Sequence, residues 1–464
     1  MAARFVNVDH DTPLLLPPDL RQWVPQNHLV HFVMDAVAQL DLRQAQVNER
    51  GTGDAQYPPA MMLGLLIFSY ATGVFSSRQI ERTTYEHVAV RLLCADTHPD
   101  HDTICTFRRQ HKALLERSFA QVLEMAARCD VLKVGGITVA IDGSKVLASA
   151  SKHAAVSYGR AGEQLQQLEL EIAQLLAKAE EADATPLEDG LTIPEEIERR
   201  QERKARLAQA RAEMEARALV RAAAEQPEHE RKVAAREAQR QAGKKPRGAE
   251  PKPPSTAPLP KDQFNFTDPE SRIMKAGTGD HFEQAYNAQA AVEVESRLIV
   301  GQHVCTAAND KEQLVPTLAA VVPAAGPVAQ LLIDSGFVSE AAVQAVESDA
   351  QGQPTGTEVL AAIKREQHGR TVADLEKKTD PEAPGPEASF EEKMAHRVAT
   401  KAGRARYKLR QQTVEPVFGI IKEAMGFRRF SLRGLAKVSL EWTLVSLAYN
   451  VRRLHRVGAT LATA

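Results

Sequence analysis

Apolar residues recur every three or four positions along the first part of the chain, a spacing that gathers them on one face of an α-helix. Leu29, Val33 and Val37 are the first to show it. Helices are predicted over residues 29–40, 59–72, 76–94 and 103–127. The pattern therefore predicts an all-α N-terminal domain over residues 1–130.

One stretch of this helical region is uncharged. Residues 57–77 contain no Asp, Glu, Lys or Arg and are about long enough to span a bilayer. However, the stretch begins with two prolines and contains Gly64 and Gly73, and Arg78 follows it directly on a helical pattern. We therefore predict a buried core helix and no membrane span.

The predicted helices are short, joined by polar turns and rich in basic residues. Asp102 is positioned to cap the helix that follows it. This arrangement can bind DNA in helix-turn-helix fashion, and an ordinary helical bundle with a solvated basic face fits equally well. The basic residues expected on the surface are Arg78, Arg82, Arg108, Arg109 and Lys112.

The pattern changes after residue 135, where short β-branched runs begin to alternate with helical segments. Strands are predicted over residues 136–142, 284–295, 297–307, 327–334 and 357–364, and helices over about 310–323 and 339–347. Glu295 and Ser296 between two of the strands suggest a tight antiparallel turn. Such alternation is typical of a mixed α/β sheet.

A long insertion separates the first two of these strands, over residues 160–270. Its first half carries a coiled-coil seam of apolar residues at alternating spacings of three and four, namely Leu165, Leu168, Ile172, Leu175 and Ala179. After a break at Pro186 and Gly190, Thr192 and Glu195 form a capping-box pattern that starts a second helix running to about residue 242. We predict a helical hairpin, followed by a Pro- and Lys-rich linker over 243–262.

Composition narrows the class of protein without identifying it. The 464 residues are 43% hydrophobic and 25% charged, ordinary values for a globular protein of two or three domains. Four cysteines without a CxxC motif do not form a disulfide framework, and the N-terminus does not resemble a signal peptide, so we expect a cytoplasmic protein. The net charge of −2 means that any DNA-binding charge must be local.

Such a local charge occurs near the C-terminus. Residues 397–437 contain eleven basic and two acidic residues, a net charge of +9, which is suited to neutralising DNA phosphates. We expect Thr413 to cap a helix whose first turn holds Glu415 and Pro416. Glu415 and Lys422 are seven residues apart, so they should share a helix face.

Two acids follow buried strands. Asp142 ends the run VAID, and Asp334 ends the run LLID. Either could be a turn residue, but a carboxylate beside a buried strand costs stability unless it has a partner. The carboxyl ends of strands in open α/β sheets face the ligand crevice. We therefore interpret the two as members of one site.

A second constellation competes as a metal site. Cys94, His98, His101 and Cys105 form the pattern C-x3-H-x2-H-x3-C. Structural zinc sites usually space their ligands more widely and in pairs. Turn formation and helix capping account for the segment more simply.

The acidic segments resemble a known family. Asp142 in VAIDGSK, Asp334 in LLIDSGF and Glu415 in TVEPVFG are similar to the three acidic motifs of bacterial insertion-sequence transposases of the DDE type. The segments DPESRIM, QAYNAQAAV and AANDKEQL also resemble family segments, as do PPAMMLGLLIFSYATGVFSSRQIE and HPDHDTICTFRRQH of the helical N-terminal part. The resemblance covers nearly the whole chain.

A basic signature surrounds the third acid. Tyr407, Arg410 and Lys422 resemble the Tyr-Arg-Glu-Lys signature of this family. The Tyr–Arg and Glu–Lys spacings agree with it. Four residues separate Arg410 from Glu415, where the family usually has three.

The resemblance implies a fold and a domain organisation. The expected core is an RNase H-like mixed sheet, with the first Asp on its first strand, the second Asp after the fourth strand and the Glu on a later helix. The predicted domains are a helical, DNA-binding N-terminal domain over 1–130, a catalytic core over 131–159 and 271–455, and a helical-hairpin (coiled-coil) insertion with its linker over 160–270.

The resemblance also implies an activity. A DDE transposase cuts DNA at transposon ends and joins them to target DNA, using two Mg²⁺ (or Mn²⁺) ions that Asp142, Asp334 and Glu415 would hold. DNA contacts are expected from Tyr407, Arg410, Lys422, Arg404, Arg406, Arg428 and Arg429. The expected protein is a nucleoid-associated homodimer. The alternative is a catalytically inactive, transposon-derived DNA-binding protein.

Overall fold

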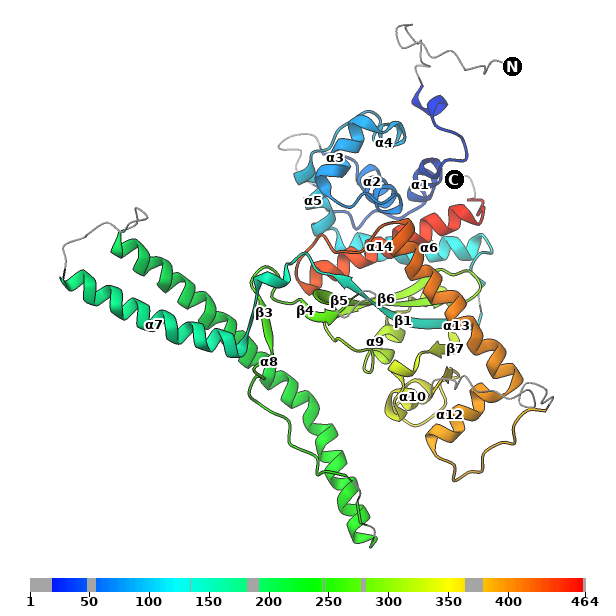
Figure 1. Cartoon of the computed structure of the whole chain (residues 1–464). Helices are drawn as coiled ribbons and strands as arrows, with labels where there is room; N and C mark the ends of the chain where they lie inside the picture. The colour runs from blue at the N-terminus through cyan, green and yellow to red at the C-terminus, as the bar shows by residue number, and fades with distance from the viewer. Residues whose placement is uncertain are drawn as a thin grey trace, which may run out of the picture. The chain divides into compact units, whose positions relative to one another are not determined.

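The computed structural model divides the chain into two compact units (Figure 1). The first comprises residues 1–146 and 287–464, and the second comprises residues 147–286. The residues that the structure describes are 19–47, 56–133, 135–181, 192–243, 245–246, 248–276, 281–363 and 379–461. Pro186 and Gly190 of the predicted break lie outside them.

The first unit begins with helices. They are η1 (Leu20–Trp23), α1 (Leu29–Ala38), α2 (Pro59–Ala71), α3 (Ser77–Glu86), α4 (Val88–Leu93), α5 (His101–Gln110) and α6 (Lys112–Arg128). Helix α2 is buried continuously from Met62 to Ala71, which confirms the predicted core helix. None of the helices within the described ranges has the length and apolar content needed to cross a membrane.

Two predicted helices are each split by a histidine. The single helix expected over 76–94 breaks at His87. The helix expected from residue 103 breaks at His111, whose buried ring bonds the carbonyl oxygens of Phe107 and Gln46. The predicted cap Asp102 was also wrong, because the carboxylate of Asp100 accepts the hydrogen bond that begins α5.

The sheet of the first unit has the order β5-β1-β7-β8, and β6 pairs with β5. Its strands are β1 (Ile137–Leu147), β5 (Phe282–Glu293), β6 (Ile299–Cys305), β7 (Val328–Ile333) and β8 (Glu358–Ala361). Strand β7 pairs in parallel with β1 and β8, whereas β5 and β6 are antiparallel. The mixed sheet predicted from the sequence is confirmed. Strand β1 does not end at Asp142 as predicted, because it continues to Leu147.

Helices surround this sheet (Figure 1). They are α9 (Leu314–Ala319), α10 (Glu340–Glu347), α12 (Phe390–Ala399), α13 (Lys401–Gly419), the π turn η5 (Ile420–Ala424) and α14 (Leu435–Arg456), with 3-10 turns η3 (Pro323–Ala325) and η4 (Ser335–Phe337). The helix expected over 310–323 is thus shorter than predicted. Helix α14 packs against α2, α6 and β6, so the N-terminal helices and the sheet share one core.

A buried polar network joins the N-terminal helices to α14. Arg108 donates to the hydroxyl of Tyr70 at 2.7 Å, and this hydroxyl donates to Oε1 of Glu441 at 2.9 Å. Arg108 is 3% exposed, so its predicted place on the surface was wrong. The charge is retained inside because Glu441 lies 4.0 Å away.

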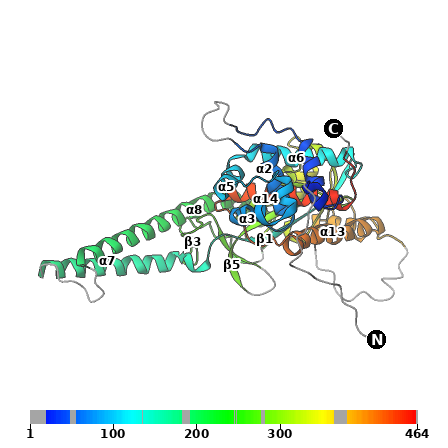
Figure 2. The same ribbon diagram turned by 90° about the horizontal axis from the view of Figure 1, so that it is seen from above.

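The second unit is built on two long helices, α7 (Tyr158–Glu181) and α8 (Ile193–Gln241), which run side by side (Figure 2). The capping box of Thr192 and Glu195 is confirmed. Leu168 is buried and Leu165 packs against the same cluster, together with Leu207 and Met214 of α8. Leu165 and Leu168 of the predicted seam are therefore used within the chain.

Short strands and an extended segment complete the second unit. The strands are β2 (Ala155–Ser157), β3 (Gln263–Asn265) and β4 (Arg272–Lys275). The 3-10 turn η2 (Lys152–Ala154) directly precedes β2. The Pro- and Lys-rich segment bonds to α8. His229 lies 3.3 Å from the carbonyl oxygen of Pro251, and Arg236 donates to that of Gly248 at 3.1 Å.

Candidate active site

The sheet register brings the two aspartates together. Ala140 of β1 pairs with Leu332 of β7 in a parallel ladder. Asp142 lies two residues after Ala140, and Asp334 lies two residues after Leu332. The two aspartates therefore lie opposite each other on neighbouring strands. Because β7 ends at Ile333, β1 has no β7 partner beyond this level. The carboxylates therefore lie at an open edge of the sheet.

One guanidinium bridges both carboxylates. Arg410 of α13 lies 3.2 Å from Oδ2 of Asp142 and 3.6 Å from Oδ1 of Asp334. Burial raises the pKa of Asp142, and the charge of Arg410 and the backbone N–H of Gly143 oppose this rise. Arg410 is itself only 8% exposed. The two acids thus share one buried cation.

Two further residues of the basic signature hold the strands at this edge. The hydroxyl of Tyr407 donates to the carbonyl oxygen of Ile333 at 3.1 Å, directly before Asp334. The ammonium of Lys422 donates to the carbonyl oxygen of Lys145 at 3.1 Å. Burial is the main cause that lowers the pKa of Lys422. Both side chains therefore contact backbone oxygens beside the aspartates.

Glu415 is not brought together with the two aspartates. Its side chain is exposed, and within the described ranges no three His, Cys, Asp or Glu side chains lie close enough to hold a metal ion. The extra residue between Arg410 and Glu415 gives the reason. Five residues turn an α-helix by about 140°, whereas the usual spacing of four turns it by only about 40°. With Arg410 facing the carboxylates, Glu415 is directed elsewhere.

The helix that carries Glu415 begins earlier than predicted. Thr400 caps α13, so the predicted cap Thr413 lies inside the helix, where its hydroxyl donates to the carbonyl oxygen of Leu409. Pro416 is also inside the helix. The chain then enters the π turn that carries Lys422. Tyr407 and Arg410 are thereby placed on the same continuous helix as Glu415.

The remaining predicted DNA contacts are exposed. Arg404 donates to the carbonyl oxygen of Ala399, Arg406 lies 3.9 Å from Glu358, and Arg428 pairs with Glu423. These contacts are at the surface, where ion pairs are worth little. The residues of this exposed group are Arg404, Arg406, Arg428 and Arg429.

A polar cluster beside Gly143 was not predicted from the sequence. Oδ1 of Asp310 accepts hydrogen bonds from Asn287 at 2.7 Å and Gln289 at 2.6 Å, and Lys145 lies 3.4 Å away. A Cβ on Gly143 would meet Gln289 and would lie 2.6 Å from Asp310, so a side chain does not fit there. The available signal was the pair of amides two residues apart in a strand that is buried along most of its length.

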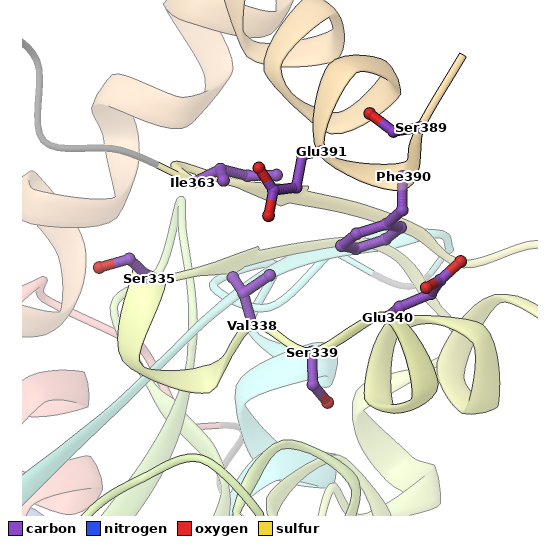
Figure 3. Close-up of a pocket in the computed structure, with 8 residues that line it drawn as sticks. All are labelled: Ser335, Val338, Ser339, Glu340, Ile363, Ser389, Phe390 and Glu391. Carbon is purple, nitrogen blue, oxygen red and sulfur yellow. The ribbon is translucent and has the colours of Figure 1, made fainter. Parts of the chain in front are cut away.

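A cavity of about 610 Å³ opens next to Asp334 (Figure 3). Ser335 lies at one side, and the ring of Phe390 and the carboxylate of Glu391 are directed toward its centre. Glu340 also lines it, and no basic side chain does among the described residues around it. Two carboxylates repel phosphate, so the cavity is unsuited to the DNA backbone.

The two histidines of the segment between Cys94 and Cys105 make other contacts. His101 lies 2.8 Å from Oε2 of Glu81, and the ring of His98 stacks on Tyr85. The cap of α5 is Asp100, as described above. These contacts agree with the capping explanation of the segment.

Comparison with known families identifies both ends of the first unit. A transposase DDE domain matches residues 382–455, which include Glu415 and the basic signature. A transposase domain, DUF772, matches residues 18–110, which include helices α1 to α5. No curated protein and no solved structure matches the chain significantly. These two matches support an insertion-sequence transposase of the DDE type.

Proposed function

We propose that this transposase cleaves DNA at transposon ends and transfers the freed strands into target DNA at a metal site built on Asp142 and Asp334. The observation that carries the proposal is the convergence of the two carboxylates on one cation, Arg410. The alternative is a catalytically inactive DNA-binding protein of transposon origin.

The strand order supports an RNase H-like core. In chain order, β1, β5, β6 and β7 are the first four strands of the sheet in the first unit. Asp142 lies on the first and Asp334 directly follows the fourth, as expected for DDE transposases. We propose the catalytic core over 131–159 and 271–455, with 160–270 as an inserted coiled coil.

The donor set at the sheet edge fits a divalent cation. Carboxylate oxygens are preferred ligands of Mg²⁺, and two acids that already share a positive guanidinium can share a metal instead. We propose Asp142 and Asp334 as ligands of Mg²⁺ or Mn²⁺, with two ions in the complete site. Glu415 faces away from the two aspartates in this structure, so we propose it as the third ligand of the DNA-bound site, where α13 would have to turn to bring it in. When bound, such metals activate the attacking oxygen and stabilise the leaving oxygen of a phosphodiester.

The same site serves both reactions because only the nucleophile differs. In the first, a water oxygen bonds to phosphorus at the transposon end, and the bond to the 3′ oxygen breaks to leave a 3′-OH. In the second, that 3′ oxygen bonds to a target phosphorus and displaces the target's own 3′ oxygen. From α13, Arg410 contacts Asp142 within β1, and Tyr407 bonds the carbonyl oxygen of Ile333 at the end of β7, so both side chains support the site.

DNA binding is proposed for two regions. The exposed arginines Arg404, Arg406, Arg428 and Arg429 neutralise phosphates, together with Arg410, Tyr407 and Lys422 nearer the acids. Helices α3 and α5 of the region 1–130 provide the second contact, in helix-turn-helix fashion. Two transposon ends must be paired, so we propose a homodimer.

Cleavage of a duplex that carries the element's own end sequence tests the proposed function. We expect the protein to nick this duplex in Mg²⁺ or Mn²⁺ and not in EDTA, and to join the freed 3′ ends to a second, unrelated DNA. A duplex with the end sequence scrambled is the matched control. Binding without any nicking in either metal would favour the inactive DNA-binding protein.

A further inference from the structure

The polar cluster around Asp310 joins β5 to the loop before α9, and its residues are not part of the proposed metal site. Asp310 lies 23% exposed in the loop before α9, and its Oδ1 accepts from Asn287 and Gln289, both of which are fully buried. Two amides fixed inside the sheet thus hold one carboxylate at the surface. The same oxygen is 3.4 Å from the ammonium of Lys145, which is 18% exposed.

Lys145 is held firmly for a surface lysine. Its carbonyl oxygen accepts a hydrogen bond from Lys422, and Gly143 two residues earlier packs against Asp310 and Gln289. An ammonium has three N–H donors, and among the described residues this one has a single contact, with Asp310 at 3.4 Å. A fixed ammonium with unused donors is suited to a phosphate oxygen.

We propose that Lys145 is a DNA-phosphate contact and that Asp310 is the residue that positions it. Lys145 and Asp142 are three residues apart on β1, so their side chains leave opposite faces of the strand. Lys145 therefore contacts a phosphate other than the scissile one, and it acts on DNA affinity and not on the chemical step. The assignment rests on the proposed function only in taking DNA as the ligand.

The chain provides a matched pair of charges for the test. Lys133 and Glu295 form an ion pair before the start of β1, and their side chains are 78% and 65% exposed. Lys133→Met and Lys145→Met each remove one positive charge, and Glu295→Gln and Asp310→Asn each remove one negative charge. The unfolding temperature of each variant is measured first, and Lys145→Arg is included because it keeps the charge.

The measurement is the affinity for a fluorescent DNA duplex of arbitrary sequence, because phosphate contacts do not read sequence. EDTA is present, so cleavage cannot contribute, and salt concentration is varied. We expect Lys145→Met to reduce the slope of log K against log salt by about 0.9 and to weaken binding about eightfold at about 0.1 M salt. Lys145→Arg should keep the wild-type slope.

The Asp310→Asn variant distinguishes a positioning role of Asp310 from the electrostatic effect of its negative charge. Loss of an acid near DNA should tighten binding by electrostatics alone, as we expect for Glu295→Gln. If Asp310 positions Lys145, Asp310→Asn instead weakens binding. The inference is overturned if Lys145→Met has the same slope as Lys133→Met, or if Asp310→Asn tightens binding. Absence of nicking by the wild type would reject the proposed function and leave this binding result standing.

Discussion

Asp142→Asn is expected to slow cleavage of an end-containing duplex in Mg²⁺ by about 10³-fold. A metal ligand contributes several kcal/mol of transition-state stabilisation, and about 4 kcal/mol corresponds to a factor of about 10³ in rate. The fold should survive the change, because burial already penalises the charged form of Asp142 and raises its pKa. Single-turnover cleavage rates measure the effect.

The control for this prediction is Asp349→Asn. Asp349 is exposed, and its Oδ1 accepts the backbone N–H groups of Gln351 and Gln353 at 2.9 and 2.8 Å. An asparagine keeps that oxygen, so the rate should not change. A rate for Asp142→Asn within threefold of the control would remove Asp142 from the reaction.

Glu441→Gln should lower the free energy of unfolding by about 3–5 kcal/mol, because it leaves the buried charge of Arg108 without its counter-ion. Oε1 of Glu441 accepts the hydroxyl of Tyr70, and Oε2 accepts the backbone N–H groups of Ser431 and Leu432 at 2.8 and 2.9 Å. An amide must turn its NH₂ group toward one of these donors. Urea unfolding at neutral pH measures the loss.

An exposed ion pair provides the comparison. Glu423 pairs with Arg428, and their side chains are 67% and 63% exposed. Glu423→Gln should therefore cost no more than about 1 kcal/mol. The double variant Arg108→Met with Glu441→Gln should be more stable than the sum of the two single losses predicts. Equal losses for Glu441→Gln and Glu423→Gln would show that the buried network does not stabilise the protein.

Local sequence patterns predicted most elements but not their interruptions. The apolar run of α2 and the strand β7 follow from periodicity, which depends only on nearby residues. The break at His111 depends on the carbonyl oxygen of Gln46, which is 65 residues away. Arg108 was predicted on the surface with the other basic residues of these helices, but its partners Tyr70 and Glu441 come from α2 and α14. Such contacts have no local signature.

The site was predicted only in part, because some of its contacts also join residues that are far apart in the sequence. Asp142 and Asp334 were recognisable because each follows a short apolar run in the sequence, and parallel pairing of β1 with β7 then places them side by side. That Arg410 bridges them depends on where α13 crosses the sheet edge, which no pattern within α13 specifies. The spacing of Arg410 and Glu415 was visible in the sequence. Its consequence, about 140° of rotation between the two side chains, required a helix that begins at Lys401.

Direct measurement of Mn²⁺ binding tests the metal site that underlies the proposed reaction. Bound Mn²⁺ is counted by electron paramagnetic resonance with the end-containing duplex present, for the wild type, Asp142→Asn, Asp334→Asn, Glu415→Gln and the control Asp349→Asn. We expect the wild type and the control to bind Mn²⁺ equally, and each of the other three variants to bind it at least about tenfold more weakly. Equal binding by all five proteins would contradict a metal site formed by these acids.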